Sequence, residues 1–166
     1  MQGPRASLVP IRRDAIGLLV PCEVGWVSEE IGYGVFAKHD IPSNCLLWKA
    51  SPQNTRTFTA TEFIRHIESL RSRANRVRLL HNTYGWRGLM WLPLDDSVYW
   101  NHSGTPNTMP GELETDDDAY AARDIQRGEE LVCNYLEFEY PHWLLDLYRR
   151  YDIDTTFIWK ATGPAP

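Results

Sequence analysis

A polar motif follows the apolar run 98–100 directly, because residues 101–107 read Asn-His-Ser-Gly-Thr-Pro-Asn. Asparagine and serine side chains bond nearby backbone groups and proline fixes φ, so such a segment makes a turn in any protein. A polar turn at the end of a buried strand nevertheless costs desolvation free energy unless it holds something. His102 has no Cys, His or carboxylate partner at metal-ligand spacing, so we expect no metal here. The segment is a candidate binding site.

Two glycines flank an aromatic residue at the second candidate site, Gly32-Tyr33-Gly34. Their missing Cβ atoms would let a ligand lie against the backbone, although this spacing is also common in strand turns. The third glycine and the following helix of a dinucleotide-binding motif are absent, and so is a phosphate-binding loop. NAD and FAD binding are therefore excluded.

The third candidate, Tyr135, ends the strand-like segment 129–135 and taken alone is typical of a half-buried strand tyrosine. The chain has no Gly-x-Ser-x-Gly motif, and its isolated cysteines and histidines suggest no nucleophilic dyad. Cys22, Cys45 and Cys133 lie far apart and are odd in number, which predicts neither a zinc site nor a disulfide framework. We therefore expect an intracellular protein of a reducing compartment, in the nucleus or the cytoplasm.

Short strands are the elements that must position these residues. Apolar runs rich in Val, Ile or aromatic residues, broken by Gly, Pro or polar turns, predict strands in five regions. These regions are 16–35, 45–48, 84–93, 119–122 and 130–135.

One helix is expected between the strands. Thr59 and Glu62 have the spacing of a capping box, and an apolar stripe from Phe63 to Leu80 predicts a helix over about 59–80. Four arginines decorate it, and we favour a solvated basic face over an anion-binding surface. They are Arg71, Arg73, Arg76 and Arg78.

A second helix is expected near the end of the chain. Pro141 is a good first helical residue, and Trp143 begins an apolar helical face, so the helix should cover about 141–151. The tail 161–166 has no core-forming residue and is expected to fray.

Composition sets the outer limits. With 166 residues, 43% of them hydrophobic, the chain suits a single domain over 1–166 and excludes whole-chain disorder. The longest apolar stretch is too short to span a bilayer, so no membrane association is expected. A net charge of −5 argues against direct nucleic-acid binding, which leaves an arginine-based nucleic-acid adaptor as the weakest alternative.

In this order, the segments resemble the SET-domain family of protein lysine methyltransferases, over about residues 18–140. The resemblance is carried by 32–37 (Gly-Tyr-Gly-Val-Phe-Ala), Asp40-Ile41-Pro42, the motif 101–107, 122–131 with its Gly-Glu-Glu-Leu end, and Tyr135. It implies a mainly β fold with an α insert (α+β). The fold would be a β-clip of small curved sheets, with a pseudoknot-like C-terminal crossing, one inserted helix and one C-terminal helix.

The resemblance also implies a cofactor and a site. S-adenosylmethionine would contact Gly32, Tyr33, Gly34, Asn101 and His102, and Tyr135 would lie beside the methyl-transfer channel. Phe138 or Trp143 would cover the cofactor. Alternatively, Trp143 simply docks the last helix. Cysteine-rich zinc modules that flank some members are absent, so we expect no bound metal.

The substrate channel departs from the family pattern. No tyrosine stands in 46–51, and 108–110 read Thr-Met-Pro where some members have another channel tyrosine. Tyr84 or Tyr99 would have to substitute, and the number of methyl groups transferred stays open. A catalytically inactive SET-like interaction module that still binds the cofactor is therefore the alternative.

The expected partner is a protein or peptide that carries a lysine, such as a histone tail. The carboxylates between Glu112 and Asp118 would attract a basic peptide, although such charge runs usually serve solubility alone. Nothing in the sequence predicts an oligomeric state.

Overall fold

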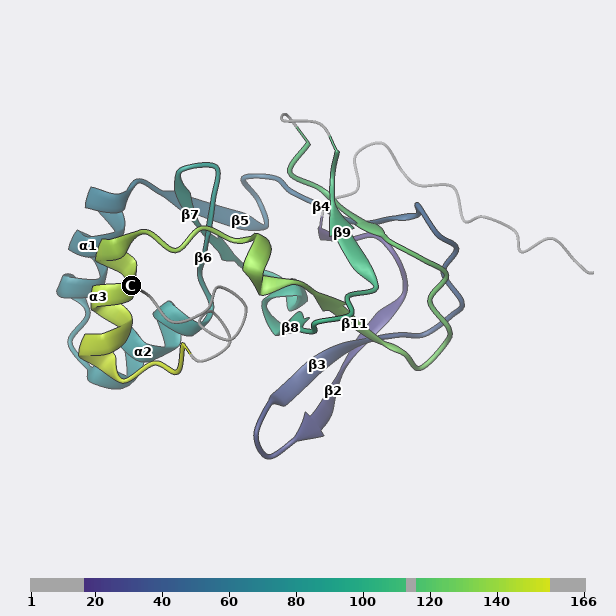
Figure 1. The fold of residues 1–166 in the computed structure, drawn as a ribbon, viewed down its shortest axis with the longest axis horizontal. Helices are drawn as coiled ribbons and strands as arrows, with labels where there is room; N and C mark the ends of the chain where they lie inside the picture. The colour runs from purple at the N-terminus through teal and green to yellow at the C-terminus, as the bar shows by residue number, and fades with distance from the viewer. Residues whose placement is uncertain (1–16, 113–115, 156–166) are drawn as a thin grey trace, which may run out of the picture.

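Residues 17–112 and 116–155, which the computed structural model describes, form three small sheets and three α-helices (Figure 1). The helices and one of the three sheets lie at one end of the molecule, and the other two sheets lie toward the opposite end. This mainly β architecture with an α insert confirms the predicted fold class. Within the described residues, none of the helices has the length and apolar character that crossing a bilayer would require.

Two four-stranded sheets hold the motif segments. The first is antiparallel, in the order β1 (Gly17–Leu18), β4 (Leu46–Lys49), β10 (Ala119–Ala121), β9 (Thr108–Pro110). The second has the order β2 (Cys22–Ser28), β3 (Gly32–Ala37), β11 (Glu130–Cys133), β8 (Asn101–His102). Seven buried hydrophobic side chains form one core cluster with both sheets. They are Val35, Ala37, Ile41, Leu47, Ala121, Ile125 and Leu131.

The parallel pair β8–β11 joins segments that are far apart in the sequence. Asn101 pairs with Val132 and His102 with Cys133, and the N–H of Ser103 donates to the carbonyl of Cys133 at 2.9 Å. The polar motif and the strand that leads to Tyr135 therefore lie side by side, as the family resemblance implied.

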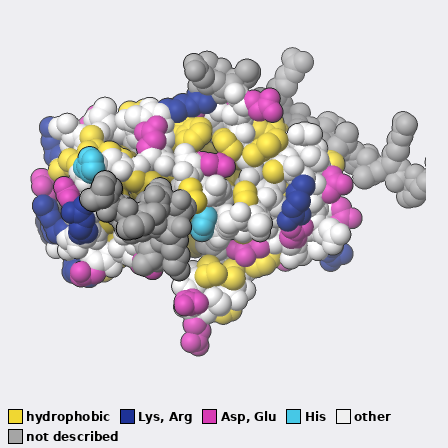
Figure 2. Space-filling model, in the orientation of Figure 1, with side chains coloured by type: hydrophobic (Ala, Val, Ile, Leu, Met, Phe, Trp, Pro, Cys, Tyr) yellow, Lys and Arg dark blue, Asp and Glu magenta, His cyan; other side chains and the backbone are white. Residues whose placement is uncertain are grey.

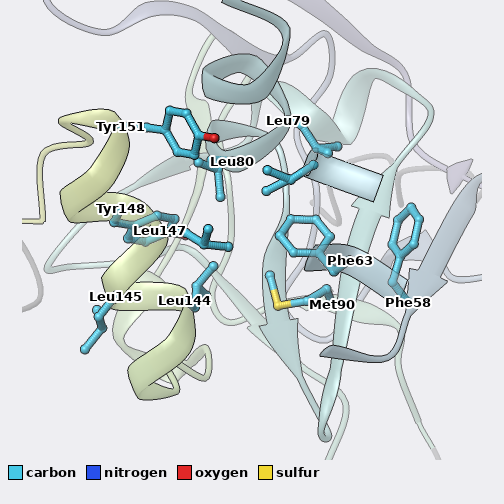
Figure 3. Close-up of a cluster of buried hydrophobic side chains, with 11 residues drawn as sticks. Phe58, Phe63, Leu79, Leu80, Met90, Leu144, Leu145, Leu147, Tyr148 and Tyr151 are labelled. Atoms are coloured by element: carbon cyan, nitrogen blue, oxygen red, sulfur yellow. The ribbon is translucent and has the colours of Figure 1, made fainter. Parts of the chain in front are cut away.

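The third sheet supports the helices. Its order is β5 (Thr55–Phe58), β7 (Leu89–Pro93), β6 (Tyr84–Trp86), all antiparallel. Phe63 and Ile67 from the first helix and Leu144 from the last pack over this sheet in a second core cluster (Figure 3).

The inserted helix predicted over 59–80 is two helices, α1 (Ala60–Ser69) and α2 (Arg73–His81). The predicted capping box is confirmed, since the Thr59 N–H donates to Glu62 Oε2 at 2.8 Å and the Glu62 N–H to Thr59 Oγ1 at 3.3 Å. Leu70 turns to extended backbone, and the Ser72 hydroxyl accepts from the Asn75 N–H at 3.1 Å to start α2. The prediction of one helix was wrong because a serine side chain caps a new helix better than it continues an old one.

The last helix, α3 (His142–Tyr151), confirms the predicted C-terminal helix. Pro141, predicted as its first residue, is instead the N-cap with extended backbone, so the helix begins one residue later. Two of the four arginines reach its far end: Arg73 donates to the Tyr151 carbonyl at 2.9 Å, and Arg76 to the Tyr151 hydroxyl at 3.4 Å. These two guanidinium groups therefore join α2 to α3. The tail 161–166, expected to fray, lies outside the described residues.

An isolated bridge between Gly85 and Glu139 ties β6 to the segment after Tyr135. The Glu139 N–H donates to the Gly85 carbonyl at 2.9 Å, and the Gly88 N–H donates to Glu139 Oε2 at 2.8 Å. A Cβ at position 85 would overlap the carbonyl oxygen of Glu139. Only glycine allows this approach of the two backbones.

Gly85→Ala is therefore expected to lower the free energy of unfolding by about 2–3 kcal/mol, because the clash involves backbone that has no rotamer to change. Urea unfolding measures the loss. Gly104→Ala is the control, since nothing lies within 4 Å of a Cβ there, and its unfolding curve should stay close to wild type. Coincident curves for all three proteins would contradict the prediction.

Candidate functional site

A cavity of about 200 Å³ lies between the helical end and the first sheet. Four aromatic side chains line one part of it: Tyr84 from β6, Tyr135, Phe138 and Tyr140. The rings of Tyr84 and Phe138 stack with centroids 4.4 Å apart, and Phe138 and Tyr135 are 5.7 Å apart. This wall is mainly apolar, and its π faces can attract a cation.

Tyr135 begins the short 3₁₀ helix η2 (Tyr135–Glu137) and is held at several atoms. Its hydroxyl donates to the carbonyl of Trp100 at 2.8 Å, and its N–H donates to Nδ1 of His102 at 3.1 Å. The Tyr140 hydroxyl donates to the Tyr135 carbonyl at 2.8 Å. The phenol is therefore fixed in both position and direction.

Burial raises the pKa of Tyr135, and nearby Cys133 and Glu130 act in the same direction. Burial likewise raises the pKa of Tyr84. Both hydroxyl groups stay protonated at neutral pH. Neither is suited to act as a phenolate base, and each can donate one hydrogen bond and accept another.

Carboxylates border the cavity. Asp117 accepts from Trp86 Nε1 at 3.0 Å and faces Arg87 Nε at 3.3 Å, and Asp118 accepts from the Ala50 N–H at 2.9 Å. Burial raises the pKa of a further lining residue, Glu137. The acidic residues Asp117 and Asp118 therefore bond to neighbouring backbone and side chains and do more than face solvent.

The other candidate residues gather around Asn101. Its amide Nδ2 donates to the Tyr33 carbonyl at 2.9 Å and to Glu130 Oε1 at 2.7 Å. A Cβ at Gly34 would overlap the Glu130 carboxylate, whereas Gly32 has φ +87 and open space around a Cβ position. Gly34 therefore makes room for Glu130, a side chain of the chain itself.

Tyr135 connects this Asn101 group to the cavity. The His102 ring lies 5.3 Å from the Tyr135 ring, although His102, Asn101 and the β3 residues 32–34 do not line the cavity. The molecule thus has a polar cluster and an aromatic cavity that share one tyrosine.

Two sequence-predicted residues lie elsewhere. Tyr99, one of the two tyrosines expected to substitute in the channel, is exposed next to Tyr33 and does not line the cavity. Trp143, a candidate cofactor cover, packs against Phe63 at 6.1 Å in the helical core, as its alternative role of docking the last helix implied. Both placements have the same cause, since the direction of a side chain depends on the path of the backbone around it. Tyr84 and Phe138 do line the cavity.

Sequence reasoning missed Glu130, the Trp100 carbonyl and Tyr140 as parts of the site. Glu130 stands in the Gly-Glu-Glu-Leu motif, so its type and position were a signal. A backbone carbonyl carries no such signal. Among the described residues, no group of three or more His, Cys, Asp or Glu side chains could hold a metal ion.

Comparison with known proteins gives one family and one fold. A family model described as SET domain matches residues 32–136, more than half of the chain. Polycomb Repressive Complex 2 of Chaetomium thermophilum, in an autoinhibited conformation bound to S-adenosylmethionine, has TM-score 0.58 and 23% identity, covering 84% of this chain and 17% of that chain. Its apo form with mutations in Ezh2 has TM-score 0.58 and 24% identity, covering 81% and 16%.

A Plasmodium falciparum chain described as a candidate histone methyltransferase has TM-score 0.48 and 22% identity, covering 75% of this chain and 97% of that chain. No curated protein matches the chain. The likeness to the two Polycomb chains shows the fold, and this chain spans less than a fifth of their length.

Glu129, beside the site, should make the free energy of unfolding depend on pH in the acidic range. Its carboxylate pairs with Arg123 and also accepts from the Gln126 N–H at 3.0 Å and the Asn107 amide at 3.2 Å. These partners, Arg123 first, lower the pKa of Glu129 from 4.5 to about 2. Because the folded-state pKa is depressed, the stabilisation is present above pH 4.5 and is lost as the pH falls through about 2.

Glu129→Gln should therefore be less stable than wild type at neutral pH, with a difference that shrinks as the pH falls from 4.5 toward 2. The effect should be modest because the pair is partly solvent-exposed. Urea unfolding across this pH range measures it, with Glu68→Gln on α1 as the control. A constant difference between wild type and Glu129→Gln at every pH would contradict the assignment.

Proposed function

The chain belongs to the SET-domain family, and from this premise we propose that it is an S-adenosylmethionine-dependent protein lysine N-methyltransferase. Family membership and the shared fold support a methyltransferase. The observation that carries the lysine proposal is Tyr135, whose hydroxyl is fixed in an aromatic cavity while its N–H is bonded to His102. A long aliphatic side chain that ends in an amine suits such a cavity.

The residues around Asn101 fit the cofactor chemically. Nδ2 of Asn101 already donates to Tyr33 and Glu130, which leaves Oδ1 as an acceptor for the ammonium group of a methionine moiety. The Glu130 carboxylate adds complementary negative charge. When bound, S-adenosylmethionine supplies a methyl group activated on a sulfonium. The residues proposed to hold it are Gly32, Tyr33, Gly34, Asn101, His102 and Phe138.

Tyr135 acts by position. The Tyr135 hydroxyl donates its hydrogen bond to the Trp100 carbonyl. Its oxygen still has lone pairs, which can accept a hydrogen bond from the incoming amine and orient the amine toward the methyl donor. The raised pKa keeps the phenol neutral, so the amine loses its proton before the cavity closes or through water. Rate enhancement then comes from alignment and exclusion of water by the aromatic wall.

The proposed substrate is a lysine in a basic protein segment, such as a histone tail. Asp117, Asp118 and Glu137 line the cavity and carry charge opposite to such a segment. The lining also includes Tyr84, and we propose that its hydroxyl substitutes for the missing channel tyrosines. We expect the protein in the nucleus or the cytoplasm.

Transfer of radiolabel from S-adenosylmethionine to core histones and to proteins of a cell lysate tests the proposal. Tyr135→Phe should lower the transfer by about 100-fold, since the amine loses its orienting oxygen. Tyr151→Phe is the matched control, because it removes a phenol from α3 outside the cavity and should keep wild-type activity. Cofactor binding without any transfer would instead favour the inactive SET-like module.

Asn101→Ala should weaken S-adenosylmethionine binding about tenfold, the effect expected for one hydrogen bond to a charged group. Isothermal titration calorimetry measures the affinity. Asn75→Ala is the control, because Asn75 takes part in capping α2 through its backbone N–H alone. If neither the wild type nor the control protein bound the cofactor, the assignment would fail.

A further inference from the structure

The hairpin of β2 and β3 projects from the body of the molecule (Figure 1). Exposed aromatic rings form a row along it. Trp26 and Tyr33 are cross-strand partners with centroids 5.3 Å apart, and Tyr99 continues the row at 6.1 Å from Tyr33. Their exposed fractions are 57%, 52% and 39%, and Ile31 at the hairpin tip is 55% exposed. Three of the six large hydrophobic residues exposed in the described part of the chain thus form one row, and a fourth, Ile31, lies on the same hairpin.

Packing within the hairpin does not account for this exposure. A cross-strand aromatic pair stabilises a hairpin by up to about 1 kcal/mol, yet both rings keep more than half of their surface in water. Single exposed hydrophobic residues are ordinary, whereas a contiguous group indicates an interaction surface. None of these four side chains lines the cavity. Tyr33 belongs to the proposed cofactor group through its backbone, whose carbonyl accepts from Asn101, and its ring stays exposed.

The charge on the hairpin selects the partner. Glu29 and Glu30 are exposed at the tip, and neither forms an ion pair among the described residues. Lys38 on the same hairpin faces Glu23 at 3.6 Å. In Figure 2 the projecting lobe shows hydrophobic side chains together with acidic ones. Such a surface repels nucleic acid and anionic lipid and attracts a cationic protein segment.

Arginine fits both features of this surface. A guanidinium stacks on aromatic faces and bonds carboxylates, and Trp, Tyr and Arg are the residues that dominate binding energy at protein interfaces. We propose that the exposed row Trp26–Tyr33–Tyr99, with Ile31, Glu29 and Glu30, docks an arginine-bearing basic segment of a partner protein. This surface is separate from the cavity and needs no methyl transfer.

A short fluorescent peptide of alternating arginine and glycine probes the surface. It contains no lysine, so it cannot be a methylation substrate, and the result is independent of the proposed function. Fluorescence anisotropy should show salt-sensitive binding to the native chain. Trp26→Ala should raise the Kd about tenfold and Ile31→Ser about threefold. Ile31→Ser leaves the Trp26–Tyr33 pair in place, so it reports on docking even where Trp26→Ala loosens the hairpin.

Two controls separate docking from general attraction by an acidic protein. Glu30→Lys should weaken binding clearly more than Glu68→Lys, which makes the same charge change on α1. Leu94→Ala, which truncates an equally exposed hydrophobic residue outside the aromatic row, should leave the Kd unchanged. Equal affinity for the native chain and all hairpin variants overturns the proposal. So does preferential binding of a duplex oligonucleotide or of anionic vesicles.

Discussion

The side chain of Asn107 is fully buried beside β11, where its Nδ2 donates to the Glu130 carbonyl at 2.7 Å and its Oδ1 accepts from the Val132 N–H at 2.9 Å. A buried amide that lost either partner would cost about 1–3 kcal/mol, so both bonds form with the fold. They hold the polar motif against β11. Asn101 and His102 consequently lie next to β11, which ends two residues before Tyr135, and the link between the polar cluster and the aromatic cavity depends on this pairing.

Two close approaches of the chain to itself then shape the two halves of the site. At Gly34 the Glu130 carboxylate occupies the space that a Cβ would fill, and this carboxylate accepts from the Asn101 amide. At Gly85 the backbone of Glu139 occupies the corresponding space, and Phe138 consequently stacks on the ring of Tyr84. Both glycines act by leaving space for protein atoms, and the polar cluster and the aromatic wall are built on that space.

Local rules in the sequence were enough for most elements. The capping box at Thr59, the helix after Pro141 and the strand β11 follow from side-chain period and capping chemistry, which act within a few residues. The strand predicted over 130–135 was too long, because it ends at Cys133 and Tyr135 begins a 3₁₀ helix. The break between α1 and α2 has the same local origin, because Ser72 can cap a helix. The apolar stripe continues through Leu80 and gave no sign of the break, because both helices bury that stripe in one cluster.

The sequence by itself determined the family, the fold class and the three segments that carry the candidate site, because residue types at fixed spacing are directly readable. Only the tertiary structure decided which aromatic side chains face the cavity. Tyr84 and Phe138 line it, whereas Tyr99 joins an exposed row and Trp143 enters the helical core. The physical reason is that such placements depend on contacts between segments distant in the chain, and spacing along the sequence contains no information about them.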